Sequence, residues 1–186
     1  MRRLVLIALL GVGTLLLSPA AQAQSRLFVA TPIGMKFTGD ISGSAESVSG
    51  YALGYGFSFH LGLGVDRLRA RANDQTNGLR TELTYKFTDV FAFWRGYGLD
   101  WQVGYGKGHV EVAPFNDTSG NSITVDRADA SQKFITVGYP LGQSFTVHLG
   151  YHLISADSPN INVNGTSAGP FNLDAKAYTL GAQLAF

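Results

Sequence analysis

The chain has 186 residues, of which 14 are Lys or Arg and 13 are Asp or Glu, so its net charge is +1. This balance lacks the basic excess of a nucleic-acid-binding surface, so no nucleic-acid partner is predicted. The absence of Cys excludes a disulfide framework, a thiol nucleophile and a Cys-based metal site. The 23 Gly residues occur together with 12% aromatic residues, which is unlike a disordered chain and typical of strands with one face kept small.

The first residues have the pattern of a secretory signal peptide. Arg2 and Arg3 precede an uncharged apolar run over residues 4–17, and Ala21 and Ala23 form a small-x-small cleavage pattern. A run of 14 residues is shorter than a membrane-spanning helix requires. We therefore predict cleavage after Ala23, which leaves residues 24–186 as one barrel domain. An uncleaved anchor is the alternative.

The rest of the chain predicts strands, because apolar residues recur at every second position and no stretch follows the period of a helix. Segment 145–153 illustrates the pattern, since its odd-numbered residues are Phe, Val, Leu, Tyr and Leu. Eight segments of this kind, each near the length of a tilted bilayer-spanning strand, occupy residues 27–37, 51–57, 61–65, 79–87, 97–105, 135–141, 145–153 and 178–186.

The residues that alternate with the apolar ones, here called the opposite parity, distinguish a membrane barrel from a soluble one. It carries Gly and scattered polar residues, whereas no charge falls on the apolar parity within the eight segments. A Gly-lined face suits the inside of a narrow barrel whose apolar face meets lipid, and closure avoids unpaired backbone groups in the hydrocarbon. The sequence therefore predicts an all-β fold, a closed eight-stranded antiparallel up-and-down transmembrane β-barrel. A soluble lipocalin-like periplasmic carrier is an alternative.

The predicted connections alternate in length. Short ones at 58–60, 88–94 and 142–143 lie on the side of both termini, and longer polar ones at 38–50, 71–78, 107–131 and 155–173 lie on the other. This is the plan of outer-membrane barrels. Within 107–131, Val110 and Val112 are predicted to face Ile123 and Val125 across a turn at 116–121.

Two segments resemble motifs of the small bacterial outer-membrane β-barrel superfamily, which includes OmpA- and OmpX-like barrels. Segment 178–186 has a terminal aromatic residue, alternating apolar residues and an aromatic residue nine positions from the end, similar to the superfamily's C-terminal signature. Segment 95–106 is similar to its fifth strand, with Gly96 where proline often follows the arginine. The resemblance implies an outer-membrane location in a Gram-negative bacterium. It also implies an assembly signal, read by the barrel-assembly machinery, at Tyr178, Leu180, Leu184 and Phe186.

Polar residues of the inward parity form a candidate lumen network. At about 3.3 Å per residue, Asp66, Glu82, Asp100 and His148 fall at a similar depth, roughly 15 Å from the short turns. Buried charges need partners, so we predict a salt-bridged plug, with a protonated carboxyl or a cationic His148 offsetting the excess of acids. A proton- or ion-responsive gate is the alternative. The predicted network is Asp66, Arg80, Glu82, Lys86, Asp100, Gln102, His148 and His152.

No pore, metal site or cofactor is predicted. Eight strands leave an interior that side chains fill. His148 and His152 both face inward, but four strand residues separate them by about 13 Å, too far to share one ion.

Arg67, Arg69 and Arg71 continue the lipid-facing parity past the apolar stretch of segment 61–65. Guanidinium groups at this position suit phosphate contacts with lipopolysaccharide. An ordinary solvated extension of the strand is the alternative reading.

The predicted function is non-enzymatic. It is surface interaction through residues 107–131 and 155–173, or support of envelope integrity, by an integral outer-membrane protein exported through the periplasm. The rival is a lipid A-modifying enzyme, which needs a Ser, a His and an acid in mutual reach. His152 and Ser155 are the nearest such pair, and their opposite parity points them to opposite faces of the strand.

Overall fold

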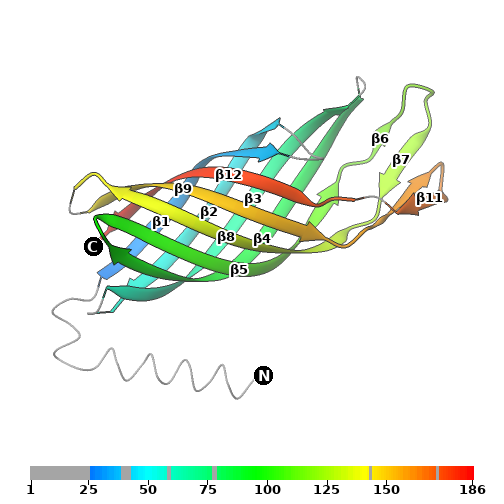
Figure 1. Ribbon diagram of the computed structural model, residues 1–186. Coiled ribbons are helices and arrows are strands. Elements are labelled where there is room, and N and C mark those ends of the chain that lie inside the picture. The colour runs from blue at the N-terminus through cyan, green and yellow to red at the C-terminus, as the bar shows by residue number, and fades with distance from the viewer. Residues whose placement is uncertain (1–25, 39–42, 58–59, 77–78, 143, 171) are drawn as a thin grey trace, which may run out of the picture.

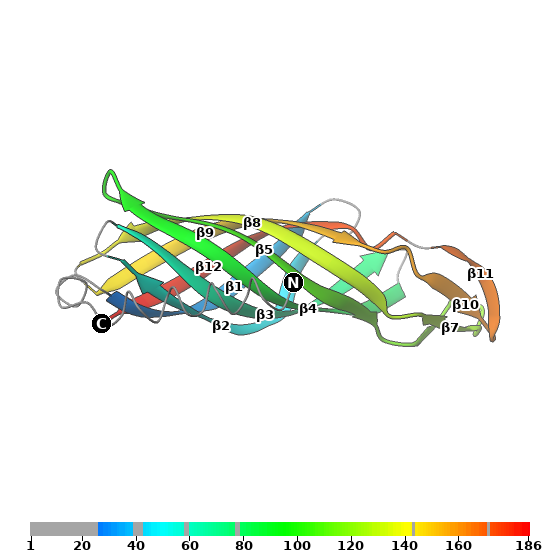
Figure 2. The ribbon, with the colours of Figure 1, turned by 90° about the horizontal axis from the view of Figure 1, so that it is seen from below.

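The computed structural model describes residues 26–38, 43–57, 60–76, 79–142, 144–170 and 172–186, so the predicted signal peptide lies outside the described residues. Eight strands, each antiparallel to both neighbours, form a closed barrel in which the last strand pairs with the first (Figure 1, Figure 2). The closed eight-stranded barrel predicted from the sequence is confirmed. Its strands are β1 (Arg26–Thr38), β2 (Gly43–Gly56), β3 (Leu61–Thr76), β4 (Leu79–Gly96), β5 (Leu99–Val112), β8 (Ala128–Pro140), β9 (Phe145–Ala156) and β12 (Ala175–Ala185).

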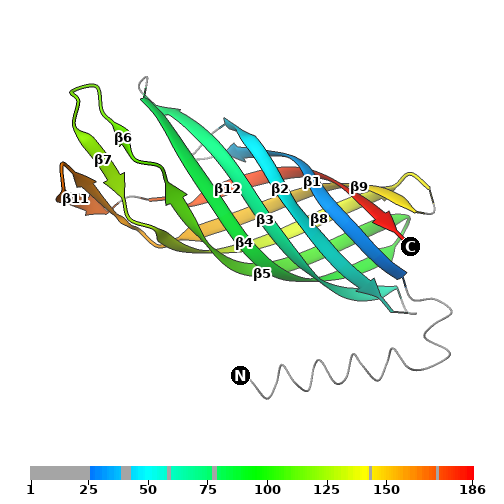
Figure 3. The ribbon, with the colours of Figure 1, turned by 180° about the vertical axis from the view of Figure 1, so that it is seen from behind.

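A second sheet continues beyond one end of the barrel. Its strand order is β11, β10, β7, β6, so the two longest connections of the chain pair with each other through β7 and β10. The end with this sheet is termed the loop end, and the opposite end, where the C-terminus lies, the turn end (Figure 1, Figure 3). The strands of this sheet are β6 (Phe115–Asn116), β7 (Ser122–Val125), β10 (Asn160–Val163) and β11 (Thr166–Pro170).

The hairpin predicted within 107–131 forms with different partners. Phe115 of β6 faces Ile123 of β7. Val110 and Val112 belong to β5 and are buried inside the barrel, so their predicted contact across the hairpin is wrong. The strands also run further toward the loop end than predicted, because β3 extends to Thr76 and β2 begins at Gly43.

The second turn at the turn end lies elsewhere than predicted. Residues 88–94 belong to the 18-residue strand β4, and the turn is formed by Tyr97 and Gly98. Their φ angles are 54° and 75°, the left-handed pair that a two-residue hairpin turn requires. Gly accepts this conformation without a steric cost, and Tyr97 tolerates it with its side chain fully exposed.

The side-chain parity of β4 is also the reverse of the prediction. Leu83, Tyr85 and Phe87 are at most 2% exposed and point into the barrel, while Val90 and Trp94 face outward. Residues 82–88 lie toward the loop end, where the apolar side chains of β4 fill the interior and the polar ones, such as Glu82 and Lys86, face outward. The prediction failed because it assumed that the apolar face meets lipid along the whole strand.

The first strand changes parity through a bulge between Pro32 and Gly34. Ile33 is exposed on the outside, whereas Met35 and Phe37 are buried inside. The ladder between β1 and β2 is interrupted from the Ala30–Ala52 pair to the Lys36–Ser44 pair. Pro32 lies within the interruption and has no N–H to donate. The Thr31 hydroxyl instead donates to the Gly50 carbonyl oxygen at 3.1 Å.

The barrel interior has three layers. The half toward the loop end is packed with apolar side chains, including Leu68, Tyr85 and Ile154. A polar belt follows, and it contains Asp89 and His152. The third layer lies toward the turn end. It is a second apolar cluster formed by the rings of Phe28, Phe91 and Phe134.

Glycines inside the barrel accommodate these rings. Gly104 lies directly across from Phe134 on β8 and from Phe91 on β4, and a Cβ at Gly104 would overlap the Phe134 ring. Gly64 stands in the same relation to Phe91. The small inward residues therefore make room for aromatic rings rather than for charged side chains.

The outer wall carries an apolar band toward the turn end. On β9, Phe145, Leu149 and Leu153 are exposed, and the even-numbered residues between them are turned inward and buried. Exposed apolar residues line the same half of every barrel strand, for example Leu53 on β2 and Val103 on β5. Among the described residues, no helix has the length and apolar character needed to cross a membrane.

Candidate functional site

The predicted lumen residues divide between the two sides of the wall. Asp66, Asp100, Gln102, His148 and His152 lie on inward positions, and all but the half-buried Asp66 are at most 8% exposed. Glu82 and Lys86 do not join them, because the parity of β4 turns both side chains outward. Arg80 lies on the backbone of β4, but its side chain is outside the described part of the structure. The predicted single cluster of three acids around Arg80 is therefore not what forms.

One interior network joins four strands. The Gln132 side-chain amide donates to the Asp89 carboxylate at 2.5 Å, and its carbonyl oxygen lies 3.2 Å from Nδ1 of His152. Nδ1 must carry the hydrogen of that contact, so Nε2 accepts from the Thr179 hydroxyl at 3.0 Å. This arrangement fits a neutral imidazole held by two bonds.

A second interior group lies nearer the turn end. Arg95 donates two hydrogen bonds to Asp100, at 2.5 and 2.7 Å, and the Thr146 hydroxyl lies 3.5 Å from the same carboxylate. Two parallel hydrogen bonds make this Arg–carboxylate pair a strong form of ion pair, in which Asp100 is buried and Arg95 is partly exposed. A prediction based on sequence alone missed Asp89 and Arg95 as interior partners. The signal for Asp89 was present, because it is the one acid within an otherwise apolar stretch of β4.

Little free volume remains beside these groups. A cavity of about 70 Å³ is lined by His152 and Thr179 of the first network and by the inward residues Asp66, Gln102 and His148. At roughly 30 Å³ per molecule, this volume corresponds to two or three waters. The cavity is too small for a solute, and no metal-binding group of three or more His, Asp or Glu occurs among the described residues.

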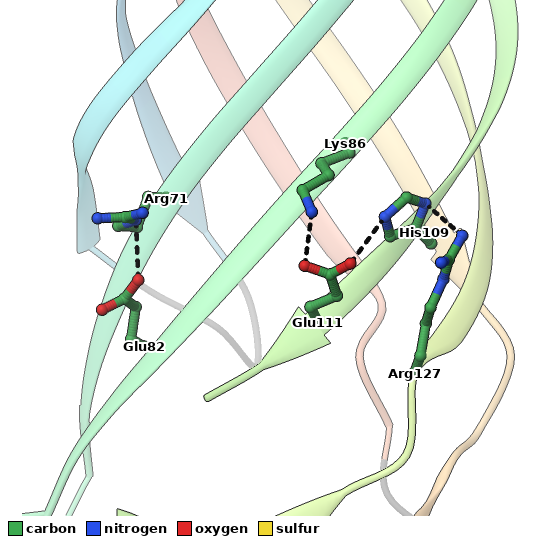
Figure 4. Close-up of polar contacts among 6 residues, drawn as sticks. All are labelled: Arg71, Glu82, Lys86, His109, Glu111 and Arg127. Carbon is green, nitrogen blue, oxygen red and sulfur yellow. Dashed lines mark hydrogen bonds and ion pairs between the residues drawn. The ribbon is translucent and has the colours of Figure 1, made fainter. Parts of the chain in front are cut away.

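Ion pairs link the outward polar residues of β3, β4 and β5 toward the loop end (Figure 4). Arg71 contacts Glu82 at 2.8 Å, and Lys86 contacts Glu111 at 2.6 Å. The chain of contacts continues through His109, whose Nε2 lies 3.0 Å from Glu111.

Arg127 completes this chain. Its guanidinium donates to Nδ1 of His109 at 2.9 Å, so Nε2 is the protonated nitrogen and donates to Glu111. The hydrogen bond from Lys86 is the main cause that lowers the pKa of the Glu111 carboxyl, and the charge of Lys86 and the hydrogen bond from His109 add to it.

The tip of the loop-end hairpin is closed by Asp117. Its carboxylate accepts hydrogen bonds at 2.8 Å from the backbone N–H groups of Ser119 and Asn121 and from the Asn121 side chain. These bonds, that of the Asn121 side chain first, hold the pKa of Asp117 below its ordinary value.

Seven outward cations follow the border of the apolar band, on six of the eight barrel strands. The strand registers connect them: Lys107 lies two positions from Tyr105, which faces Lys133, and Lys133 and Lys176 both face Leu153. Together they form the surface termed here the basic collar, Lys36, Arg67, Arg69, Lys86, Lys107, Lys133 and Lys176.

Two of the collar cations face each other directly. Arg69 of β3 is the cross-strand partner of Lys86 of β4. Like charges in this position repel each other. Lys86 is compensated by Glu111, whereas Arg67, Arg69 and Lys107 have no ion-pair partner among the described residues. The collar therefore presents unneutralised positive charge at the border of the apolar band.

The remaining predicted site residues lie as follows. Arg71, like Arg67 and Arg69, points outward on β3, but Glu82 occupies its guanidinium. Tyr178, Leu180 and Leu184 are exposed on the outer face of β12, and the exposed Phe186 follows them at the turn end. His152 is buried inside the barrel and Ser155 is exposed outside it, so this pair cannot act together.

No protein-family model matches the sequence, and neither does any curated protein. Solved structures match it in fold. Ail, the attachment invasion locus protein of Yersinia pestis, aligns with a TM-score of 0.57 and 12% identity over 88% of this chain and 99% of its own. It has also been solved in complex with the heparin analogue sucrose octasulfate.

Two further structures extend the comparison. Neisserial surface protein A aligns with a TM-score of 0.51 and 13% identity over 87% of this chain and 97% of its own. The outer membrane protein OprG from Pseudomonas aeruginosa aligns with a TM-score of 0.52 and 10% identity over 88% and 96%. At such identities the likeness concerns architecture alone. The closed barrel and these likenesses together show that the chain has the fold of the small eight-stranded bacterial outer-membrane barrels.

Proposed function

We propose that the protein is a non-enzymatic integral protein of the bacterial outer membrane, and that its basic collar binds phosphate groups of lipopolysaccharide in the outer leaflet and so supports the envelope. In this arrangement the apolar band lies in the hydrocarbon and the loop end faces the cell exterior. The barrel-assembly machinery is the proposed partner during biogenesis, through the exposed β12 residues and Phe186.

The apolar band supports the membrane location. From Phe145 to Leu153, eight steps of about 3.3 Å along a strand tilted by about 40° give a height of roughly 20 Å. This is close to the outward apolar belt of outer-membrane barrels. A soluble lipocalin-like carrier would expose this band to water and would need an interior cavity larger than the one present.

The unpaired collar charge is the observation that carries the proposed function. Exposed cations repel each other unless an anion lies between them, and the border of the band is where phosphates of outer-leaflet lipids lie. Arg67 and Arg69 are the best placed, because neither has an acidic partner among the described residues. Ail, a barrel of the same fold, has been solved in complex with the heparin analogue sucrose octasulfate, a polyanionic sugar, which agrees with an anionic ligand for a barrel of this fold.

The test is a double substitution, Arg67→Gln with Arg69→Gln. At about 1 kcal/mol for each cation near a membrane surface, the loss of both lowers the affinity for lipopolysaccharide in nanodiscs by a factor of roughly ten or more. Arg127→Gln, which removes a positive charge outside the collar, is the control and leaves binding nearly unchanged. Equal binding by the double variant and the unmodified protein contradicts the proposal.

The second sheet favours an additional role in surface interaction. It is built from both predicted interaction segments, 107–131 and 155–173, and extends beyond the end of the barrel (Figure 2). Cells that display the protein with residues 115–125 replaced by a short turn should lose adhesion to a surface partner and keep lipopolysaccharide binding. Unchanged adhesion would place the partner site elsewhere.

A further inference from the structure

A polar groove of about 590 Å³ lies on the outer wall where β5, β8 and β9 rise above the apolar band. It is lined chiefly by Tyr105, Lys107, Asp129, Ser131, Ser155 and Asp157. The registers explain its shape. Lys107, Ser131 and Ser155 form one row across the three strands, and the short serine side chains leave a hollow between longer neighbours.

Two carboxylate residues border the groove on the side of the loop end. Asp129 lies two residues before Ser131 on β8, and the backbone N–H of Asp157 donates to the Asp129 carbonyl oxygen at 2.8 Å. Tyr105 borders the opposite side, 43% exposed and directly across from the collar residue Lys133. The groove is therefore acidic above, hydroxylated and basic in the middle, and aromatic below, with Lys133 beside the aromatic side.

The polar side chains of the groove have free hydrogen-bonding capacity. Among the described residues, those of Lys107, Asp129, Ser131, Ser155 and Asp157 make no hydrogen bond or ion pair with another protein group. Lys107 and Asp129 are close neighbours of opposite charge, yet they are not paired with each other. Such side chains around one hollow can all be directed to a ligand.

We propose that this groove binds the phosphorylated sugar headgroup of an outer-leaflet glycolipid, an inference that rests on the membrane orientation and collar of the proposed function. A bare anion does not fit, because Asp129 and Asp157 would repel it. A sugar satisfies every group: its hydroxyls donate to the carboxylates and exchange hydrogen bonds with the serines. Its C–H face packs on Tyr105, while Lys107 and Lys133 contact the phosphate.

Removal of the two carboxylates tests the proposal, because sugar recognition and simple charge attraction predict opposite changes in the affinity for lipopolysaccharide. The variant Asp129→Asn with Asp157→Asn is compared with the unmodified protein in nanodiscs. The probes are deep-rough lipopolysaccharide, which carries lipid A and inner-core sugars, and phosphatidylglycerol, which carries charge without these sugars. Sugar recognition predicts that affinity for deep-rough lipopolysaccharide falls by a factor of about ten, since hydrogen bonds to charged acceptors are lost. Attraction by charge alone predicts that affinity for both lipids rises.

Two controls separate the possible failures. Asp126→Asn removes an exposed acid of the loop end outside the groove and should not lower sugar-dependent binding. Ser131→Trp fills the groove without a change of charge, and should weaken binding of deep-rough lipopolysaccharide alone. Heat-modifiable gel mobility verifies that each variant is folded.

The outcomes distinguish this inference from the proposed function. If the Arg67→Gln, Arg69→Gln variant loses affinity for both lipids while the Asp129→Asn, Asp157→Asn variant gains it, the collar stands and the sugar site is rejected. If the arginine variant binds both lipids like the unmodified protein, the proposed function itself is rejected.

Discussion

Inside the barrel, individual glycines define where the aromatic rings lie. The Cβ of an alanine at Gly104 would overlap the ring of Phe134 across the ladder. We expect Gly104→Ala to lower the free energy of unfolding by about 1–3 kcal/mol, since an overpacked core must shift side chains or backbone. Gly34→Ala is the matched control, because a Cβ there meets no atom within 4 Å. Urea unfolding in lipid vesicles measures both, and equal values for the two variants would contradict this account of the interior.

At the loop end, Glu111 gives the stability a pH dependence. Its folded-state pKa is lowered from the ordinary value of 4.5, chiefly by the hydrogen bond from Lys86. The stabilisation is therefore complete above the unfolded-state pKa and is lost as the pH falls through the lower folded-state pKa. The residue is largely exposed, so the contribution is below about 1 kcal/mol.

The substitution Glu111→Gln measures this contribution. Urea unfolding should show the variant as slightly less stable than the unmodified protein at pH 7, and the difference should vanish in acid below the folded-state pKa. A difference that persists at low pH would show that Glu111 acts through packing rather than through its charge.

The orientation of strand β4 can be tested by introducing an arginine at outward positions inside and outside the apolar band. Val90 faces outward within the apolar band, and Thr88 faces outward nearer the collar. An arginine in the hydrocarbon is costly in a depth-dependent way, so Val90→Arg should lower the free energy of unfolding by about 2 kcal/mol and Thr88→Arg by less than about 1 kcal/mol. Equal costs, measured by urea unfolding in vesicles, would support the turn at 88–94 instead.

The same strand shows why part of the fold could not be predicted from the sequence. On β9 the outward residues are large and apolar and the inward ones are Gly, Thr and His, so alternation gave the correct faces. On β4 the alternation over residues 82–88 is equally clear, but this half of the strand lies beyond the apolar band, so the apolar face points inward and the polar face outward. A turn was also predicted at 88–94, where the strand continues. On β1 a bulge at Pro32 reversed the parity, which a strict alternation cannot represent.

The candidate site could likewise be predicted from the sequence only in part. Arg67 and Arg69 could be placed on the outer wall because β3 keeps its alternation. The basic collar as a whole could not be predicted from the sequence. Its position depends on the registers of neighbouring strands, which align Lys133 and Lys176 beside Leu153. The groove likewise depends on the alignment of Lys107 with Ser131 across β5 and β8.

For the whole molecule, closure joins the two ends of the chain. The ladder between β1 and β12 pairs residues such as Phe28 and Ala185, which are nearly a full chain length apart. Pairing of this kind makes folding slow, because the loop entropy must be overcome before the contact forms. The barrel can close only after the last strand is available.

The interrupted ladder between β1 and β2 gives the finished wall a preferred place to open. Residues 31–35 and 45–50 lack the continuous cross-strand bonds of β4 and β5, and the Thr31–Gly50 contact lies within the gap. The free energy of local opening is lowest where few hydrogen bonds must break. Amide hydrogen exchange in vesicles should therefore be fastest, within the barrel wall, at these residues, and uniform protection would contradict it. Because the wall has one weakly bonded junction, we expect β1 and β2 to separate first under destabilising conditions, while the other strand pairs remain hydrogen-bonded.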